Sequence, residues 1–268
     1  MFKAPLRSLI LTVAMLIVIG FAAHSFADHS WGNYHWARTS NPFTLKVGDN
    51  VSPAWDSHFN AAISDWNGSS VLNLQAVSGG SKGKNCRPTV GQIEVCNATY
   101  GNNGWLGIAQ IWITGGNHIT QAITKLNDTY FNSATYNTPA WRQFVMCQEV
   151  GHDFGLDHQD EAFDNPNLGS CMDYTSNPST NQWPNAHDFE QLEIIYEHLD
   201  GTTTVGSAKL PNGMPPAMGQ IVFDTPGQWG RLVRSSRNQR VQVYELDFGR
   251  GHRVVTHVFW ADPDADAR

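Results

Sequence analysis

Apolar and polar residues recur along the chain with two different periods, and each period predicts a different kind of element. In PFTLKVGDNV, residues 42–51, the apolar residues Phe43, Leu45 and Val47 stand at every second position, which predicts a strand with one buried face. Residues 71–77 and the region between Cys86 and Cys96 predict two further β elements. The run GWLGIAQIWIT at 104–114 is apolar almost throughout, so we expect a strand that is buried on both faces or forms an important edge.

Apolar residues at helical spacing predict four helices, over residues 52–67, 117–132, 138–155 and 187–199. Ser52 and Thr138 are each followed by proline and are expected as N-caps, while Gly155 ends the third helix. A linker rich in Gly, Pro and Thr begins at 201 and leads into alternating segments. We therefore expect residues 201–268 to form a β-rich C-terminal tail or small subdomain, for which the sequence suggests no chemistry.

The first 27 residues are typical of a secretory signal peptide. Lys3 and Arg7 precede an apolar stretch, which ends in small residues before Ala27. We expect cleavage near Ala27 and secretion, with a retained membrane anchor as the alternative. No later segment is apolar enough to span a bilayer, so no membrane contact is expected after cleavage.

Composition narrows the function further. Roughly 240 residues remain after the signal peptide, enough for one substantial domain with a small addition. The formal net charge is −7 and no basic run occurs, which argues against a nucleic-acid partner. We expect a monomer whose partner is a peptide or protein substrate.

The stretch QEVGHDFGLDH, residues 148–158, carries the candidate chemistry. Gln148 and His152 are four residues apart, so they lie on one face of the expected helix, with Glu149 beside them. Gly155 lets the chain reverse, which brings His158 back towards them. Three such ligands can hold one metal ion and leave a position open for water, and Glu149 is placed to act as general base.

This stretch resembles the extended zinc signature of the metzincin proteases, H-E-x-x-H-x-x-G-x-x-H, at every fixed position but the first. Downstream, SCMDY at 170–174 resembles the Met-turn of that clan, and the order of elements over about 41–200 is similar to that of matrixin-like enzymes. The resemblance implies a catalytic domain over residues 28–200. It also implies His152 and His158 as zinc ligands, Glu149 as base, Met172 as the floor of the site and Tyr174 as a second catalytic group.

The resemblance carries two structural expectations as well. The segment 106–112 resembles the edge strand along which these enzymes bind an extended substrate by β-addition. Four cysteines allow three disulfide connectivities, with free buried thiols as the alternative. We prefer Cys86–Cys96, which closes a short predicted hairpin, and Cys147–Cys171, because in this clan the active-site helix and the Met-turn meet below the metal.

Gln148 is the departure from the signature. Its amide oxygen is a neutral ligand and a poorer zinc donor than an imidazole. Either Gln148 ligates the metal through that oxygen, or Tyr174, Asp157 or a water fills the position, or the protein has lost catalysis and only binds peptides. All other signature residues are in register, which favours a functioning enzyme.

The remaining polar candidates are weaker. His118 could cap or pack, with a metal ligand as the minor alternative. His187 is expected to cap the last helix, with a second metal site as the minor alternative. The other histidines have no constellation around them in the sequence; they are His29, His35, His58, His198, His252 and His257. An acidic loop could hold Ca²⁺ but lacks the spacing of a calcium loop, so a solvated loop is the better interpretation; it contains Asp160, Glu161, Asp164, Asn165 and Asn167.

The sequence therefore predicts an α+β fold. We expect a metzincin-like twisted mixed sheet with backing helices, an active-site helix and a Met-turn, followed by the β-rich tail. The predicted function is a secreted zinc-dependent endopeptidase with one catalytic Zn²⁺ and Glu149 as general base. The alternative is a non-catalytic relative that binds peptides or proteins.

Overall fold

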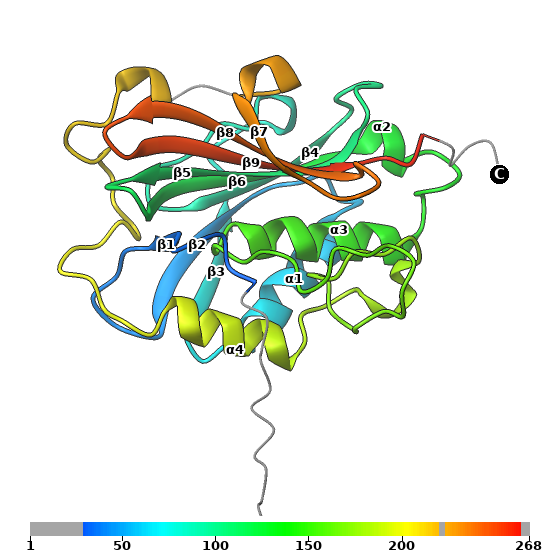
Figure 1. Cartoon of the computed structure of the whole chain (residues 1–268), viewed down its shortest axis with the longest axis horizontal. Coiled ribbons are helices and arrows are strands. Elements are labelled where there is room, and N and C mark those ends of the chain that lie inside the picture. Colours follow the sequence, from blue (N-terminus) through cyan, green and yellow to red (C-terminus); the bar gives the residue numbers. More distant parts are fainter. Residues whose placement is uncertain (1–28, 220–222, 264–268) are drawn as a thin grey trace, which may run out of the picture.

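The computed structural model describes residues 29–219 and 223–263 (Figure 1). The expected signal peptide lies outside the described residues. Within those ranges, no helix is both long enough and apolar enough to cross a bilayer.

The described residues form one nine-stranded mixed sheet. Its strands are β1 (His35–Trp36), β2 (Phe43–Asn50), β3 (Leu72–Ser78), β4 (Ile93–Ala98), β5 (Trp105–Thr114), β6 (His118–Asn127), β7 (Arg231–Ser235), β8 (Val241–Gly249) and β9 (His252–Trp260). The strand order is β3-β2-β4-β6-β5-β9-β8-β7, and β1 pairs beside β6 off this path. The β2–β3, β2–β4, β4–β6 and β1–β6 pairs are parallel, and all the others are antiparallel. The fold is thus of the mixed α+β class, as predicted.

The three longer helices, α1, α3 and α4, lie on one side of this sheet, and the single turn α2 lies at its end, directly after β6 (Figure 1). They are α1 (Asp56–Trp66), α2 (Asp128–Phe131), α3 (Pro139–His152) and α4 (Ala186–Ile195), with short 3-10 turns at Gly83–Asn85, Pro178–Thr180, Pro216–Met218 and Pro226–Gln228. The main core lies between helices and sheet, and a second apolar cluster packs Met214, Met218, Phe223 and Trp229 against the opposite face.

The strand β5 separates these two cores. Leu106, Ile111 and Ile113 belong to the helix-side core, whereas Ile108 and Trp112 belong to the opposite cluster. Every residue of β5 is buried. This explains why its sequence is apolar almost throughout and confirms the expectation of burial on both faces.

The helix predicted over residues 117–132 is wrong. This stretch forms strand β6, followed by the single turn α2. β6 lies between β4 and β5, and its apolar residues are divided between the two cores, with Ile119 and Leu126 on the helix side and Ile123 on the other. A strand buried on both faces does not need to alternate, so its apolar residues can fall at helical spacing by chance.

The C-terminal segment is β-rich, and its strands extend the main sheet. β9 runs antiparallel to β5, with Ala109 opposite His257, and β8 and β7 follow outward. Phe259 and Val255 lie in the same core as the helices. The free edge expected along 106–112 is therefore absent, because β9 already fills the pairing positions of β5.

The local signals were right about some helix ends and wrong about others. Thr138 caps α3, accepting a hydrogen bond from Trp141 N, as predicted. The helix α1 begins at Asp56, after a turn from Ser52, and has no side-chain cap. For α4 the cap is Asn185, with a capping box to Asp188, and not the expected His187. Both preferred disulfides, Cys86–Cys96 and Cys147–Cys171, are formed.

Candidate metal centre

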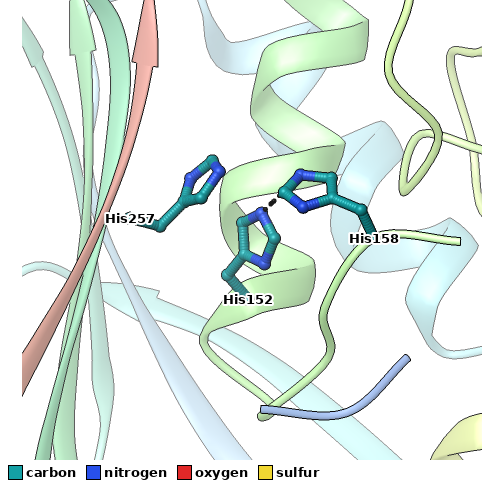
Figure 2. A group of neighbouring side chains, drawn as sticks. All are labelled: His152, His158 and His257. Carbon is teal, nitrogen blue, oxygen red and sulfur yellow. Dashed lines mark hydrogen bonds between the residues drawn. The ribbon is translucent and has the colours of Figure 1, made fainter. Parts of the chain in front are cut away.

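The helix α3 and the turn after it bring two histidines together. His152 is the last residue of α3, and Gly155 follows with φ +91°, a backbone angle that side chains disfavour. A Cβ at Gly155 would lie 2.1 Å from the Tyr34 carbonyl oxygen, so only glycine fits there. The chain then turns back, and His158 Nε2 lies 3.2 Å from His152 Nε2 (Figure 2).

A third histidine comes from the C-terminal strand. His257 projects from β9 towards the other two rings, as Figure 2 shows. One nitrogen of each of the three imidazoles lies within 4.8 Å of the others, which is close enough for a shared metal ion. The expectation that His257 has no constellation around it is wrong, because pairing of β9 with β5 carries it into the site from almost 100 residues away.

Hydrogen bonds fix the orientation of these rings. His152 Nδ1 lies 2.9 Å from the Leu156 carbonyl oxygen, so Nδ1 carries the ring proton and Nε2 has a free lone pair for a metal ion. Trp31 stacks on the same ring at 4.7 Å. His257 Nδ1 lies 2.8 Å from Glu149 Oε2, so the candidate base directly contacts the third histidine.

Gln148 directs one end of its amide towards the segment that carries Cys171 and Met172. Its Nε2 donates to the Cys171 carbonyl oxygen at 2.9 Å, which assigns Oε1 to the other side. Oε1 is buried and has no hydrogen-bond partner among the described residues. A buried oxygen without a hydrogen-bond partner is unusual, and such an oxygen is suited to bind a metal ion. The ligand role of Gln148 stays a prediction.

Met172 packs beneath the C-terminal turn of α3. A Cβ at Gly151 would lie 2.6 Å from Met172 Sδ and 2.7 Å from Trp66 Cζ2, so this helix position must be small for both side chains to approach. The disulfide Cys147–Cys171 joins α3 to the segment that carries Met172. The Tyr174 ring lies 4.0 Å from that of His158.

Burial dominates the electrostatics. It raises the pKa of the Glu149 carboxyl well above its usual value. It lowers the pKa of His152 and of His158 well below theirs, an effect to which the neighbouring histidines add, and lowers the pKa of His257 to about 3. The three imidazoles are therefore neutral at pH 7, which is the form that binds a metal.

The donor set fits zinc. Three neutral imidazoles match the nitrogen ligands that zinc prefers. Several buried polar atoms at the site have no hydrogen-bond partner within the described ranges: Gln148 Oε1, Glu149 Oε1, His158 Nδ1 and His257 Nε2. A cation among these atoms would interact with some of them in place of the missing hydrogen bonds, and it would favour the ionised form of Glu149.

The site is closed. Glu149, His152 and His257 are fully buried, and His158 is 6% exposed. Arg234 of β7 forms an ion pair with Asp157, the neighbour of His158, which fastens the C-terminal segment over the site. Asp157 is thus engaged by Arg234 and, through Oδ1, by His158 N at 2.8 Å.

The acidic loop is held by protein partners. Asp160 accepts from Ala162 N and from Asn165 Nδ2, and Glu161 lies 3.5 Å from Arg234. Asn167 donates to the Asn177 carbonyl oxygen. These contacts give no support to a calcium site.

Sequence comparisons do not place the chain in a family: no protein-family model matches it, and no curated protein does. Among solved structures, it is similar to high choriolytic enzyme 1, a hatching enzyme zinc-protease from the medaka fish Oryzias latipes. The match has 10% sequence identity and a TM-score of 0.33, and it covers 61% of this chain and 94% of that one. Similarity at this level does not establish a common fold, so the case for a metal centre comes from the residues themselves.

Proposed function

We propose that the chain is a secreted zinc-dependent endopeptidase of the metzincin design, held in a closed, latent form. The observation that carries the proposal is the contact of the Glu149 carboxylate with a cluster of three neutral histidines, 2.8 Å from His257 Nδ1. A carboxylate beside a metal-binding imidazole cluster is what general-base hydrolysis requires. Met172 below and Tyr174 beside His158 support the same design.

Each residue has a distinct role in this proposal. His152, His158 and His257 hold the zinc ion in the closed form. When bound, zinc supplies Lewis-acid polarisation of the substrate carbonyl. Glu149 takes a proton from the attacking water and returns it to the leaving amine, while the Tyr174 hydroxyl donates a hydrogen bond to the developing oxyanion.

The strand β9 keeps this form inactive. It pairs antiparallel with β5, the position in which an extended peptide substrate would add to the sheet. A peptide can bind only after β9 leaves, and His257 leaves with it. Gln148 Oε1 then serves as the third ligand. His257 is thus the third ligand in the closed form, and Gln148 takes this role in the open form.

One observation favours a second candidate, a non-catalytic zinc protein. Val254, Val258 and Phe259 of β9 are at most 1% exposed, so the strand is part of the core and its departure is costly. A closed set of protein ligands is also typical of structural zinc sites. In this candidate, zinc stabilises the fold and no bond is cleaved.

Activity before and after release of β9 distinguishes the two candidates. A specific protease site is placed at Asn212–Gly213, in the exposed linker, and the zinc-loaded protein is incubated with a peptide mixture before and after nicking in mild denaturant. The proposal expects no cuts before nicking and chelator-sensitive cuts afterwards, read by mass spectrometry. The Glu149→Ala variant, treated identically, is the control and should not cut. Zinc-loaded, folded, nicked protein without cleavage would favour the structural zinc protein.

A further inference from the structure

A second cluster of metal-binding side chains lies outside the candidate metal centre. It consists of His35 on β1, and of His198 and Asp200 on the segment after α4. One ligand atom of each lies within 4.8 Å of the others. His35 and His198 were expected to have no constellation around them, and the structure contradicts that expectation.

The distances within this cluster match the edges of a zinc coordination shell. His35 Nε2 lies 3.3 Å from His198 Nε2 and 3.4 Å from Asp200 Oδ1, and His198 Nε2 lies 3.7 Å from the same oxygen. Ligand atoms at about 2.0–2.2 Å from a tetrahedral zinc ion are roughly 3.3 Å apart. The three atoms thus surround one point at the spacing that zinc requires.

The hydrogen bonds of His35 leave a lone pair directed into the cluster. Its Nδ1 lies 2.6 Å from the Asn33 carbonyl oxygen, so that nitrogen carries the proton of the neutral ring. The deprotonated Nε2 then faces the carboxylate oxygen of Asp200, and two acceptors in contact repel each other. A cation between the two atoms relieves the repulsion.

The carboxylate is held in place for this role. Arg38 donates to Asp200 Oδ2 through its backbone N at 3.1 Å and through Nη1 at 3.0 Å, which leaves Oδ1 turned towards the histidines. His118, at the start of β6, places its Nε2 3.2 Å from Oδ1 on the side of the sheet. A ligating carboxylate fixed by an arginine and a ligating histidine bonded to a carbonyl are the usual supports of a metal site.

The cluster is open to solvent, unlike the candidate metal centre. His35 and His198 line a surface hollow of about 350 Å³ together with Asn33, Asn117 and Gln191. The His198 side chain is 54% exposed. A metal ion can therefore enter directly, and water can complete its coordination.

We propose that His35, His198 and Asp200 form a second zinc site, independent of the proposed peptidase centre. The ion joins β1 to the segment that follows α4, two parts of the chain that are 163 residues apart. Because the ligands converge only in the folded chain, zinc at this site stabilises the fold.

Metal stoichiometry tests the proposal. The full chain without its expected signal peptide is freed of metal and dialysed against micromolar zinc, and bound zinc per chain is measured by mass spectrometry. Wild type is expected to bind two equivalents and His198→Ala one. His58→Ala is the matched control, a half-buried histidine on α1 outside both clusters, and should bind two. The double variant His152→Ala/His158→Ala should keep the equivalent that His198→Ala loses.

The same measurement separates failure of this site from failure of the metal centre. Equal zinc content in wild type and His198→Ala overturns the second site, whether that content is one or two. If wild type binds only one equivalent and His198→Ala binds none, the second site is supported, and the zinc site at His152, His158 and His257 is refuted instead. Cobalt substitution adds a direct readout: its visible bands should show a second ligand set that disappears in His198→Ala.

Discussion

The two histidine clusters differ in access more than in chemistry. His152, His158 and His257 are sealed between α3 and β9, with His158 the most exposed at 6%. In the other cluster, His35 and His198 line a surface hollow, and His198 is 54% exposed. Both clusters use imidazole nitrogens with a carboxylate close by. The comparison teaches that burial, and not ligand type, decides whether a bound ion can exchange without movement of the chain.

The largest expected difference is in the rate of zinc removal. A chromogenic chelator mixed with zinc-loaded protein should release two equivalents in two phases. The exposed cluster empties first, and the buried one on the order of 1,000 times more slowly, because its ion escapes only through local opening. Absorbance of the chelator complex after rapid mixing measures both phases.

Single substitutions assign these phases. His198→Ala should remove the fast phase only, and His257→Ala should accelerate the slow phase, because it removes the ligand that β9 supplies. A single phase in wild type, or a slow phase insensitive to His257→Ala, would show that the closing strand does not control the buried site.

Two of the three histidines in the buried cluster, His152 and His158, could be predicted from the sequence. The spacing of Gln148 and His152 on one helix and the glycine turn before His158 are local features, and local features are visible in one sequence. His257 is 99 positions beyond His158 and reaches the site only through the register of β9 on β5. A signal did exist: His257 stands between Val255 and Phe259, two positions either side of it, and so lies on the same apolar face of the strand.

The second cluster carried no local signal. His35 is on a two-residue strand and His198 follows a helix, so only the fold brings them together. The same limit explains the error at β6, where burial on both faces removed the alternation that marks a strand. Elements with one buried face, such as β2, α1 and α4, were predicted because their period survives. The helix α3 is buried on all sides from Gln143 to His152, and the signals at its ends, Thr138 and Gly155, supported its prediction.

The disulfide Cys147–Cys171, which joins α3 to the segment before Met172, should affect the two clusters unequally. Replacing Cys147 and Cys171 by alanine is expected to lower the free energy of unfolding by about 3 kcal/mol, because the unfolded chain gains conformational entropy without the cross-link. Zinc should also be released faster from the buried centre, since Gln148 bonds the Cys171 carbonyl oxygen, while the exposed cluster keeps its release rate. Denaturant unfolding and the chelator assay measure the two effects.

The matched control for this prediction is removal of Cys86–Cys96. That bond closes a shorter loop and lies in the apolar cluster on the other face of the sheet. It should cost less stability and leave both release rates unchanged. Equal effects of the two removals on the buried centre would contradict the proposed link between the Cys171 segment and the metal.

Gly155→Ala should break the independence of the clusters. The new Cβ would meet the Tyr34 carbonyl oxygen, next to His35, and the backbone angle of +91° would be strained. We expect a loss of about 2 kcal/mol in stability and weaker zinc binding at both clusters, since the turn positions His158 and pushes on the segment that carries His35. Thermal unfolding and zinc dialysis measure this. Unchanged binding at the exposed cluster would show that the two sites do not share this contact.

The smallest expected effect is that of Arg234→Ala. Arg234 pairs with Asp157 beside His158, but its side chain is 37% exposed, so solvent screening limits the pair to about 1 kcal/mol or less of stability. The release of zinc from the buried centre should accelerate a few-fold, because one fastening of the C-terminal segment is lost. The exposed cluster should not respond. Arg231→Ala, at an exposed position on the same strand, is the control and should leave both rates unchanged. If Arg231→Ala accelerates release as much as Arg234→Ala does, general loosening of β7 accounts for the effect, and the ion pair with Asp157 has no special part in keeping the site closed.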